Sequence, residues 1–180
     1  MRRELRIINA AVFALVAFIY FGARSFVFTS DQKSFPADHG RYMISRVVDG
    51  DTVVLSDGRK VRLIGIDTPE VYFSEKLLKD SKKSGQDIDT IQALGKRASE
   101  FTKKLCLGKK VRVEYDVEKK DRYGRTLAYI YLEDGTFVNA KIVEEGFAQV
   151  LTIPPNVKYS DQFIKLQAQA RESGKGLWKT

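Results

Sequence analysis

The sequence predicts a small α+β domain that follows an N-terminal hydrophobic helix. Two stretches, residues 41–66 and 109–132, carry the β-branched, aliphatic and aromatic residues that favour strands. Two others, residues 91–107 and 160–173, repeat apolar residues at helical spacing. A chain of 180 residues has room for one such domain plus appendages.

The N-terminal residues carry a targeting or anchoring signal. Residues 7–23 are almost entirely apolar, a length at the lower limit of a membrane span that also fits a secretory signal. We therefore predict that residues 1–28 form a signal peptide or a signal-anchor transmembrane helix, which touches the membrane through residues 7–28 if it is not cleaved. Arginines at positions 2, 3 and 6 favour a cytoplasmic N-terminus. The rest of the chain is then extracytoplasmic, either anchored in the cytoplasmic membrane or secreted.

Residues 29–40 are polar and turn-prone, and we interpret them as a linker to a domain at residues 41–180. The linker holds His39, the only histidine of the chain, and Cys106 is the only cysteine. These counts exclude a disulfide within the chain and a Cys/His zinc site. Cys106 falls in an amphipathic helical pattern, so we expect a packed helix residue rather than a nucleophile.

Three strands open the predicted domain, at residues 41–48, 51–55 and 61–66. Asp57-Gly58 between the last two is the dipeptide typical of a two-residue hairpin turn. Such a turn places Val53 opposite Arg62 and brings Asp51 and Arg62 to one face of the hairpin.

The third strand leads into charged residues. Arg62 stands among aliphatic residues, where a guanidinium needs an anion to offset the free energy of burial. Asp67, Thr68 and Glu70 follow at the end of the strand and offer hard oxygen ligands, and Pro69 stiffens the exit. Singly, each of these residues fits an ordinary turn or strand end. Together, they predict a site for a phosphate and a divalent metal.

Lysines and acidic residues alternate irregularly through residues 71–90, and we predict a long exposed loop with at most a helical turn near residues 74–79. A helix at 91–107 ends before Gly108, and strands follow at 109–117 and 126–132. A short helix is expected at 138–145. The last helix is expected to begin with Ser160 or Asp161 as its N-cap, and Trp178 to pack back on the domain.

Three sequence blocks resemble the staphylococcal nuclease (thermonuclease) family in order and spacing. They are Asp49-Gly50-Asp51-Thr52, the stretch from Arg62 through Asp67-Thr68-Pro69-Glu70, and the stretch from Asp121-Arg122-Tyr123-Gly124-Arg125 through Tyr131. The resemblance extends over residues 41–178. It implies the topology that the pattern alone leaves open, an α+β fold with a five-stranded OB-fold barrel and about three helices.

The resemblance also implies roles for individual residues. Asp51, Asp67 and the main-chain carbonyl of Thr68 would bind Ca²⁺, which suits an all-oxygen ligand set. Glu70 would position or deprotonate a water molecule, and Arg62 and Arg125 would bind the substrate phosphate and stabilise the transition state. Tyr123, beside Arg125, is a further candidate for substrate binding.

The family resemblance further implies a Ca²⁺-dependent, sequence-nonspecific nuclease that hydrolyses DNA and RNA to products with 3′-phosphates. One departure concerns residues 150–156, which lack the two tyrosines that pack on the terminal nucleotide in relatives. We therefore do not extend to this chain the packing of tyrosines on the terminal nucleotide.

The net charge of +8 favours a polyanionic partner, here DNA and RNA, and we expect a monomer. The alternative hypothesis is a non-catalytic OB-fold module that binds nucleic acid while tethered to the membrane. Such a module would not need the full set of charged site residues, so their presence favours the enzyme.

Overall fold

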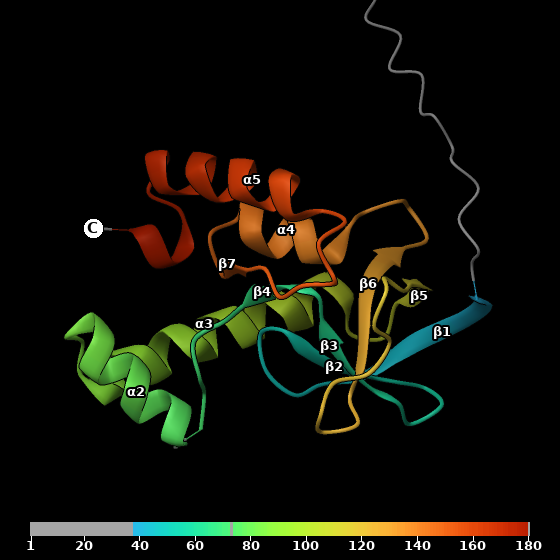
Figure 1. Cartoon of the computed structure of the whole chain (residues 1–180), viewed down its shortest axis with the longest axis horizontal. Coiled ribbons are helices and arrows are strands. Elements are labelled where there is room, and N and C mark those ends of the chain that lie inside the picture. The colour runs from blue at the N-terminus through green and yellow to red at the C-terminus, as the bar shows by residue number, and fades with distance from the viewer. Residues whose placement is uncertain (1–37, 73, 180) are drawn as a thin grey trace, which may run out of the picture. The chain divides into compact units, whose positions relative to one another are not determined.

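The structure is a computed structural model that describes residues 38–72 and 74–179 (Figure 1). The predicted signal or anchor at residues 1–28 lies outside the described residues, as do residues 29–37 of the predicted linker. Within the described ranges, no helix has both the length and the apolar character needed to cross a membrane.

A closed five-stranded barrel forms the centre of the domain, with the strand order β1-β2-β3-β6-β5. Its strands are β1 (Asp38–Val47), β2 (Thr52–Leu55), β3 (Lys60–Leu63), β5 (Lys110–Glu114) and β6 (Thr126–Leu132). Neighbouring strands run antiparallel except β3 and β6, which pair in parallel. The predicted fold class, α+β with a five-stranded OB-fold barrel, is confirmed.

Alternate residues of each strand fill the barrel. Ile44, Val53, Val61, Val113 and Ile130 are all at most 1% exposed. This is the two-residue period expected of strands with one buried face. Truncating one such side chain to alanine removes about 2–5 kcal/mol of stability, so the barrel is a rigid frame for whatever its rim carries.

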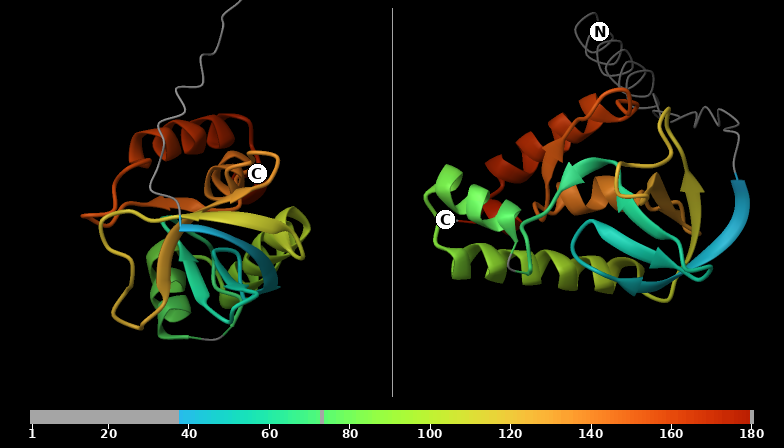
Figure 2. Two further views of the ribbon diagram at one scale, coloured as in Figure 1. Left: turned by 90° about the vertical axis from the view of Figure 1, so that its right-hand side faces the viewer. Right: turned by 60° about the horizontal axis from the view of Figure 1, so that its bottom comes forward.

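In the described residues, four helices and a short ribbon pack beside the barrel and on one another (Figures 1 and 2). The helices are α2 (Glu75–Ser84), α3 (Ile88–Cys106), α4 (Val138–Glu144) and α5 (Ser160–Glu172), and a 3-10 turn, η1 (Gly176–Trp178), follows them. The ribbon pairs β4 (Gly65–Asp67) with β7 (Gln149–Leu151). The predicted third strand, residues 61–66, is thus divided between β3 and β4.

Asn139 of α4 fixes the connection between β3 and β4. The side chain is fully buried, donates from Nδ2 to the carbonyl of Ile64 (2.9 Å), and accepts from the backbone N–H of Ile130 (3.1 Å). Gly65 follows with φ of +83°, and a Cβ there would lie 2.4 Å from the Phe163 ring. The chain therefore turns sharply at Ile64 and enters β4 in one defined direction.

The predicted hairpin register is wrong by one residue. Leu55 N donates to the carbonyl of Arg59 (2.9 Å), so the loop has three residues and not two, and Gly58 takes the left-handed conformation at φ of +86°. Thr52, and not Val53, therefore lies opposite Arg62. Asp51 precedes β2, and this position lets its side chain reach Arg62 despite the shifted register.

The long loop predicted at residues 71–90 is also wrong, because most of it is helical. Ser74 caps α2 by accepting from Leu77 N (3.1 Å), and Leu77 is completely buried as α2 packs on α3. Asp87 caps α3, which begins at Ile88. One buried leucine among many charged residues gives a weak periodic pattern, although the cap residues were visible in the sequence.

Smaller differences concern the ends of elements. The residue before α5 is Tyr159, which makes no side-chain capping bond, so neither Ser160 nor Asp161 is the N-cap. The first strand begins at Asp38, three residues before the predicted domain boundary at residue 41. Cys106 is buried, and its thiol donates to the Thr102 carbonyl (3.1 Å), as expected of a packed helix residue.

Candidate active site

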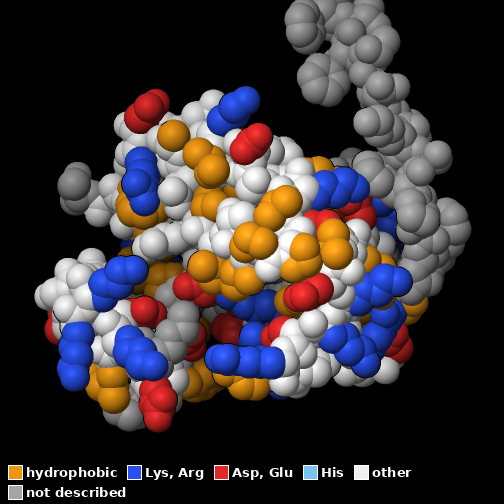
Figure 3. Space-filling view, in the orientation of Figure 1, with side chains coloured by type: hydrophobic (Ala, Val, Ile, Leu, Met, Phe, Trp, Pro, Cys, Tyr) orange, Lys and Arg blue, Asp and Glu red, His pale blue; other side chains and the backbone are white. Residues whose placement is uncertain are grey.

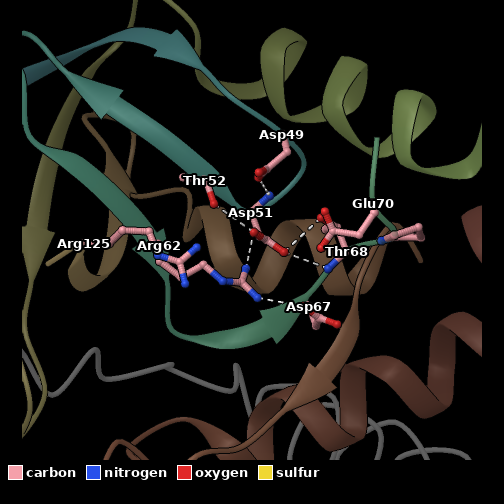
Figure 4. Close-up of a pocket in the computed structure, with 9 residues that line it drawn as sticks. Asp49, Asp51, Thr52, Arg62, Asp67, Thr68, Glu70 and Arg125 are labelled. Atoms are coloured by element: carbon pink, nitrogen blue, oxygen red, sulfur yellow. Dashed lines mark hydrogen bonds and ion pairs between the residues drawn. The ribbon is translucent and has the colours of Figure 1, made fainter. Parts of the chain in front are cut away.

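Charged side chains from four chain segments line one pocket of about 170 Å³ at the rim of the barrel. The segments are the entrance to β2, the strand β3, the end of β4 with the residues after it, and the residue before β6. The lining residues are Asp49, Asp51, Thr52, Arg62, Asp67, Thr68, Pro69, Glu70 and Arg125. Figure 4 shows how they lie.

Arg62 lies between two carboxylates. Its Nη2 donates to Asp67 Oδ1 (2.8 Å), its Nη1 forms an ion pair with Asp51 Oδ1, and only 14% of the side chain is exposed. Burial would lower the pKa of the guanidinium, but the charges of Asp51 and Asp67 raise it above its usual value. Arg62 therefore stays charged at the wall of the pocket, as its place among aliphatic residues predicts.

Asp51 joins the entrance of β2 to the end of β4. Its Oδ2 accepts from the backbone N–H of Thr68 (2.8 Å) and from the Thr68 hydroxyl (2.9 Å), and its Oδ1 accepts from the Thr52 hydroxyl (3.1 Å). The side chain is 7% exposed, so these bonds hold a nearly buried carboxylate in one orientation. Thr68 is fixed with it, and its backbone therefore has a defined position beside Asp51.

Asp49 is a pocket residue that the sequence analysis treated only as part of a turn and a motif. Its Oδ1 accepts from the backbone N–H of Asp51 (3.1 Å). Burial and the charge of Asp51 raise the pKa of Asp49 to about 6. The Asp-Gly-Asp spacing was the available signal, because a glycine between two acids lets both carboxylates reach the same pocket.

Glu70 lies on the other side of the Asp51–Arg62 pair from Arg125 (Figure 4). Its backbone rests on α3 at Gly95, where an added Cβ would come within 2.5 Å of the Glu70 carbonyl oxygen and 2.7 Å of the Pro69 oxygen. Only glycine allows this approach. The contact with α3 therefore fixes the position of the Glu70 backbone at the pocket.

Arg125 is held by Asp121 at the other side of the pocket. Asp121 Oδ2 accepts from Arg125 Nε (2.6 Å), and Oδ1 accepts from the backbone N–H groups of Arg125 (2.9 Å) and Tyr123 (2.9 Å). Burial would raise the pKa of Asp121, but its bonds to Arg125 outweigh this effect and lower the pKa. The parallel pairing of β3 with β6 brings Arg125 and Arg62 to the same pocket although 63 positions separate them.

Comparison with known proteins agrees with this arrangement. The family model described as "Staphylococcal nuclease homologue" matches residues 60–180, which include Arg62, Asp67, Glu70 and Arg125. The chain is 41% identical over 141 residues to the thermonuclease of Staphylococcus intermedius, covering 77% of this chain and 76% of that protein. It is 39% identical over 145 residues to the thermonuclease of Staphylococcus hyicus, covering 79% and 78%.

The chain belongs to the staphylococcal nuclease family. It is accordingly a nuclease, a hydrolase of phosphodiester bonds. A more distant relative is the endonuclease YhcR of Bacillus subtilis, 35% identical over 158 residues, where the match covers 82% of this chain but 12% of that protein. The predicted family is thus confirmed.

A divalent cation fits the charges of this nuclease's pocket. Four carboxylates, those of Asp49, Asp51, Asp67 and Glu70, face two guanidiniums, a formal charge of −2 that would repel a phosphodiester. All candidate ligand atoms are oxygens, which suits Ca²⁺. Among residues 38–72 and 74–179, no three His, Cys, Asp or Glu side chains are already grouped as metal ligands.

Tyr123 lies outside the pocket lining. It is 68% exposed, its hydroxyl accepts from Arg122 Nη2 (2.7 Å), and its ring centre is 5.6 Å from Arg125 Cζ. Its role in substrate binding therefore stays a prediction.

Residues 150–156, where the family resemblance led us to expect two tyrosines, form a largely apolar surface. Leu151 is 39% exposed and Ile153 61%, and Figure 3 shows hydrophobic side chains gathered over β7 and the start of α5. Tyr159 does not replace the missing rings, because its hydroxyl donates to Glu114 (2.9 Å) and its ring packs against Tyr129 and Phe137.

Proposed function

We propose that the chain is a Ca²⁺-dependent, sequence-nonspecific nuclease that hydrolyses the phosphodiester bonds of DNA and RNA and leaves 3′-phosphates. The observation that supports this most is the pocket itself, in which the guanidinium of Arg62 in β3 and that of Arg125, just before the parallel strand β6, meet four carboxylates. The arrangement offers charge to a phosphate and contacts no base. Lack of sequence preference follows from this, because phosphate contacts carry no sequence information.

Asp51, Asp67 and the carbonyl of Thr68 are the proposed ligands of the calcium ion. Asp51 is already oriented by Thr68 and Thr52, so little conformational entropy remains to be lost when it binds a cation. Bound there, Ca²⁺ would polarise the phosphodiester and offset the negative charge of the pocket.

Glu70 is the proposed base, and the arginines are the proposed phosphate ligands. The Glu70 carboxylate accepts a proton from a water molecule, whose oxygen forms a bond to phosphorus while the bond from phosphorus to the 5′-oxygen breaks. Arg62 and Arg125 donate hydrogen bonds to the phosphoryl oxygens, on which negative charge grows in the transition state. The 5′-oxygen takes up a proton from solvent water and leaves as a hydroxyl, the phosphate stays on the 3′-oxygen, and Glu70 returns its proton to solvent.

The test is degradation of plasmid and single-stranded DNA by the full chain in nonionic detergent, with Ca²⁺ or with chelator. We expect cleavage only with Ca²⁺, and its loss in Glu70→Gln and Arg125→Ala. Undiminished cleavage in chelator would refute the calcium requirement. A folded chain that binds DNA but cuts nothing with any divalent metal would instead favour the alternative, a non-catalytic OB-fold module tethered to the membrane.

The site of action is a separate proposal. The apolar residues 7–23 and the arginines before them support an extracytoplasmic enzyme, secreted or anchored in the cytoplasmic membrane through residues 7–28. N-terminal sequencing of the mature protein from membrane and medium fractions distinguishes the two forms. Recovery of the uncleaved chain from the cytoplasm would contradict both. Sedimentation of the same material tests the proposed monomer.

A further inference from the structure

A basic and aromatic surface begins beside the pocket at Lys60 and continues to the end of the barrel where the hairpin between β2 and β3 turns. We call it the cation–tyrosine surface and define it by Tyr42, Arg59, Lys60, Tyr115, Lys119 and Lys120. None of these residues lines the pocket. They come from β1, the hairpin between β2 and β3, the start of β3, and the segment between β5 and β6.

The surface is joined to the pocket along β3. Val61 and Leu63 point into the barrel, at 0% and 1% exposure, so Lys60 and Arg62 share the outer face of the strand. Two residues on one face of a strand are about 6.6 Å apart, close to the separation of neighbouring phosphates in a polynucleotide chain. Lys60 is exposed, so a nucleic-acid strand that leaves Arg62 along β3 would meet Lys60 next.

The pairing of β3 with β6 adds cations on the other side of this path. Val61 is the parallel partner of Thr126, so Lys60 lies beside Arg125 at the start of the two strands. Leu127 N donates to the Lys119 carbonyl (2.9 Å), and Lys120 bridges to Thr126. Both lysines are exposed. Lys119 is aligned with Leu127 and so shares the face of Lys60 and Arg62, and Lys120 stands at the edge of that face.

Arg59 is oriented by two tyrosines at the outer end. Its Nη1 donates to Tyr115 Oη (2.7 Å), and its Cζ lies 4.3 Å from the centre of the Tyr42 ring. Lys119 Nζ lies 5.4 Å from the centre of the Tyr115 ring. The partly exposed rings and the guanidinium plane form a platform of the kind on which unpaired bases stack.

The acidic residues near this surface are already neutralised in part. Asp57 pairs with Arg59 through Nε (2.6 Å), and Asp121 pairs with Arg125 (2.6 Å). For the residues that the structure describes, no carboxylate pairs with Lys60, Lys119 or Lys120. These three lysines, which have no carboxylate partner in the described part of the chain, are therefore available to phosphates.

We infer that the cation–tyrosine surface binds the single-stranded continuation of the substrate, on one side of the phosphate that is cut. This inference rests on the proposed function and extends it from one phosphate to several nucleotides. Phosphates lie on Lys60, Lys119 and Lys120, and unpaired bases stack at Arg59 and the tyrosines. Duplex DNA fits less well, because its bases are stacked on one another and are not free to meet the platform.

The test measures binding without catalysis. The full chain in nonionic detergent is titrated, with chelator present, against a fluorescent single-stranded DNA of 20 nucleotides, and Kd is followed from 50 to 200 mM KCl. The variant is Lys60→Gln with Lys119→Gln, and the matched control is Lys165→Gln with Lys179→Gln, two exposed lysines of α5 and the C-terminus. Each lost phosphate contact lowers the slope of log Kd against log salt by about 0.7, or about 5-fold in Kd at 0.1 M salt.

We therefore expect a slope lower by about 1.4 and a Kd weaker by about 25-fold in the variant, and no change in the control. An unchanged Kd and slope in the variant, or an equal loss in the control, would overturn the inference. Equal or tighter binding of a 20-base-pair duplex would overturn its single-strand part.

An activity arm separates this inference from the proposed function. With Ca²⁺, the variant should cut a dinucleotide with one phosphodiester bond as the wild type does, while its KM for the 20-nucleotide strand rises. If the variant raises KM for the dinucleotide as much as for the longer strand, the lysines act at the pocket and the inference is wrong. A wild type that binds the strand and cuts neither substrate would refute the proposed function and leave the binding surface in place.

Discussion

Replacing Asp121 by asparagine is expected to lower kcat about 10–100-fold while KM changes less than 3-fold. Asp121 does not line the pocket, but it holds both the backbone and the Nε of Arg125. Asparagine keeps an oxygen for the backbone N–H groups of Tyr123 and Arg125. At the position of Oδ2, it turns an amide N–H toward the Nε–H of Arg125, so two donors face each other.

The magnitude follows from the bonds that are lost. One charge-assisted hydrogen bond of a side chain that is 16% exposed is replaced by a repulsive contact, and we expect the free energy of unfolding to fall by about 1–2 kcal/mol. Arg125 then occupies several rotamers. Its contact with the transition state is weakened by about 1.4–2.7 kcal/mol, which is the stated 10–100-fold in kcat.

The assay is steady-state cleavage of the 20-nucleotide strand with saturating Ca²⁺, together with thermal unfolding of each variant. Asp121→Asn is made alone and in the Arg125→Ala background. If Asp121 acts through Arg125, the second change adds nothing to the loss caused by the first. A loss of stability with unchanged kcat, or full additivity in the double variant, would refute this reasoning.

Three further predictions concern the pocket and its support. The pKa of Asp49 is raised to about 6, so the protonated carboxyl contributes stability that is complete below pH 3.8 and is lost as pH rises through 6. Asp49→Asn should therefore raise the unfolding free energy in chelator by up to about 3 kcal/mol at pH 7 and by much less at pH 4. Equal effects at the two pH values would contradict the raised pKa. Gly95→Ala should displace the Glu70 backbone and lower kcat at least 10-fold without abolishing folding, as circular dichroism would show, and a fully active variant would mean that this contact is not needed. Asn139→Ala should lower the unfolding free energy by about 2–4 kcal/mol in a denaturant titration, because it leaves buried backbone groups of Ile64 and Ile130 without partners; a loss below 1 kcal/mol would argue against it.

The residue pattern was sufficient for a small α+β domain with its main strands, and the family resemblance supplied the barrel topology in which the charged residues converge. Barrel strands bury one face, so their two-residue period is visible, and the motif residues lie at strand ends where topology brings them together. The predicted hairpin register was wrong because Asp-Gly fits both a two-residue and a three-residue loop. Only the hydrogen bond between Leu55 and Arg59 distinguishes the two loops. The loop prediction for the segment that forms α2 was wrong because the packing of this helix depends on a single buried side chain, Leu77.

Asp121 and Asp49 show a different limit. Both stood inside motifs, but their effects depend on three-dimensional contacts. Asp121 matters because both of its oxygens are used within its own loop, and the pKa of Asp49 is raised by burial that no local pattern reveals. Sequence spacing predicts which residues meet, and the structure adds which of them orient the others.

The parallel ladder between β3 and β6 has a consequence for the life of the protein before it folds. It is a non-local pairing of residues 65 positions apart, and loop closure of this length comes late for a polypeptide. Until that ladder forms, nothing holds the guanidiniums of Arg62 and Arg125 near each other. The nuclease site is therefore absent while the chain is being synthesised and exists only once the barrel has closed.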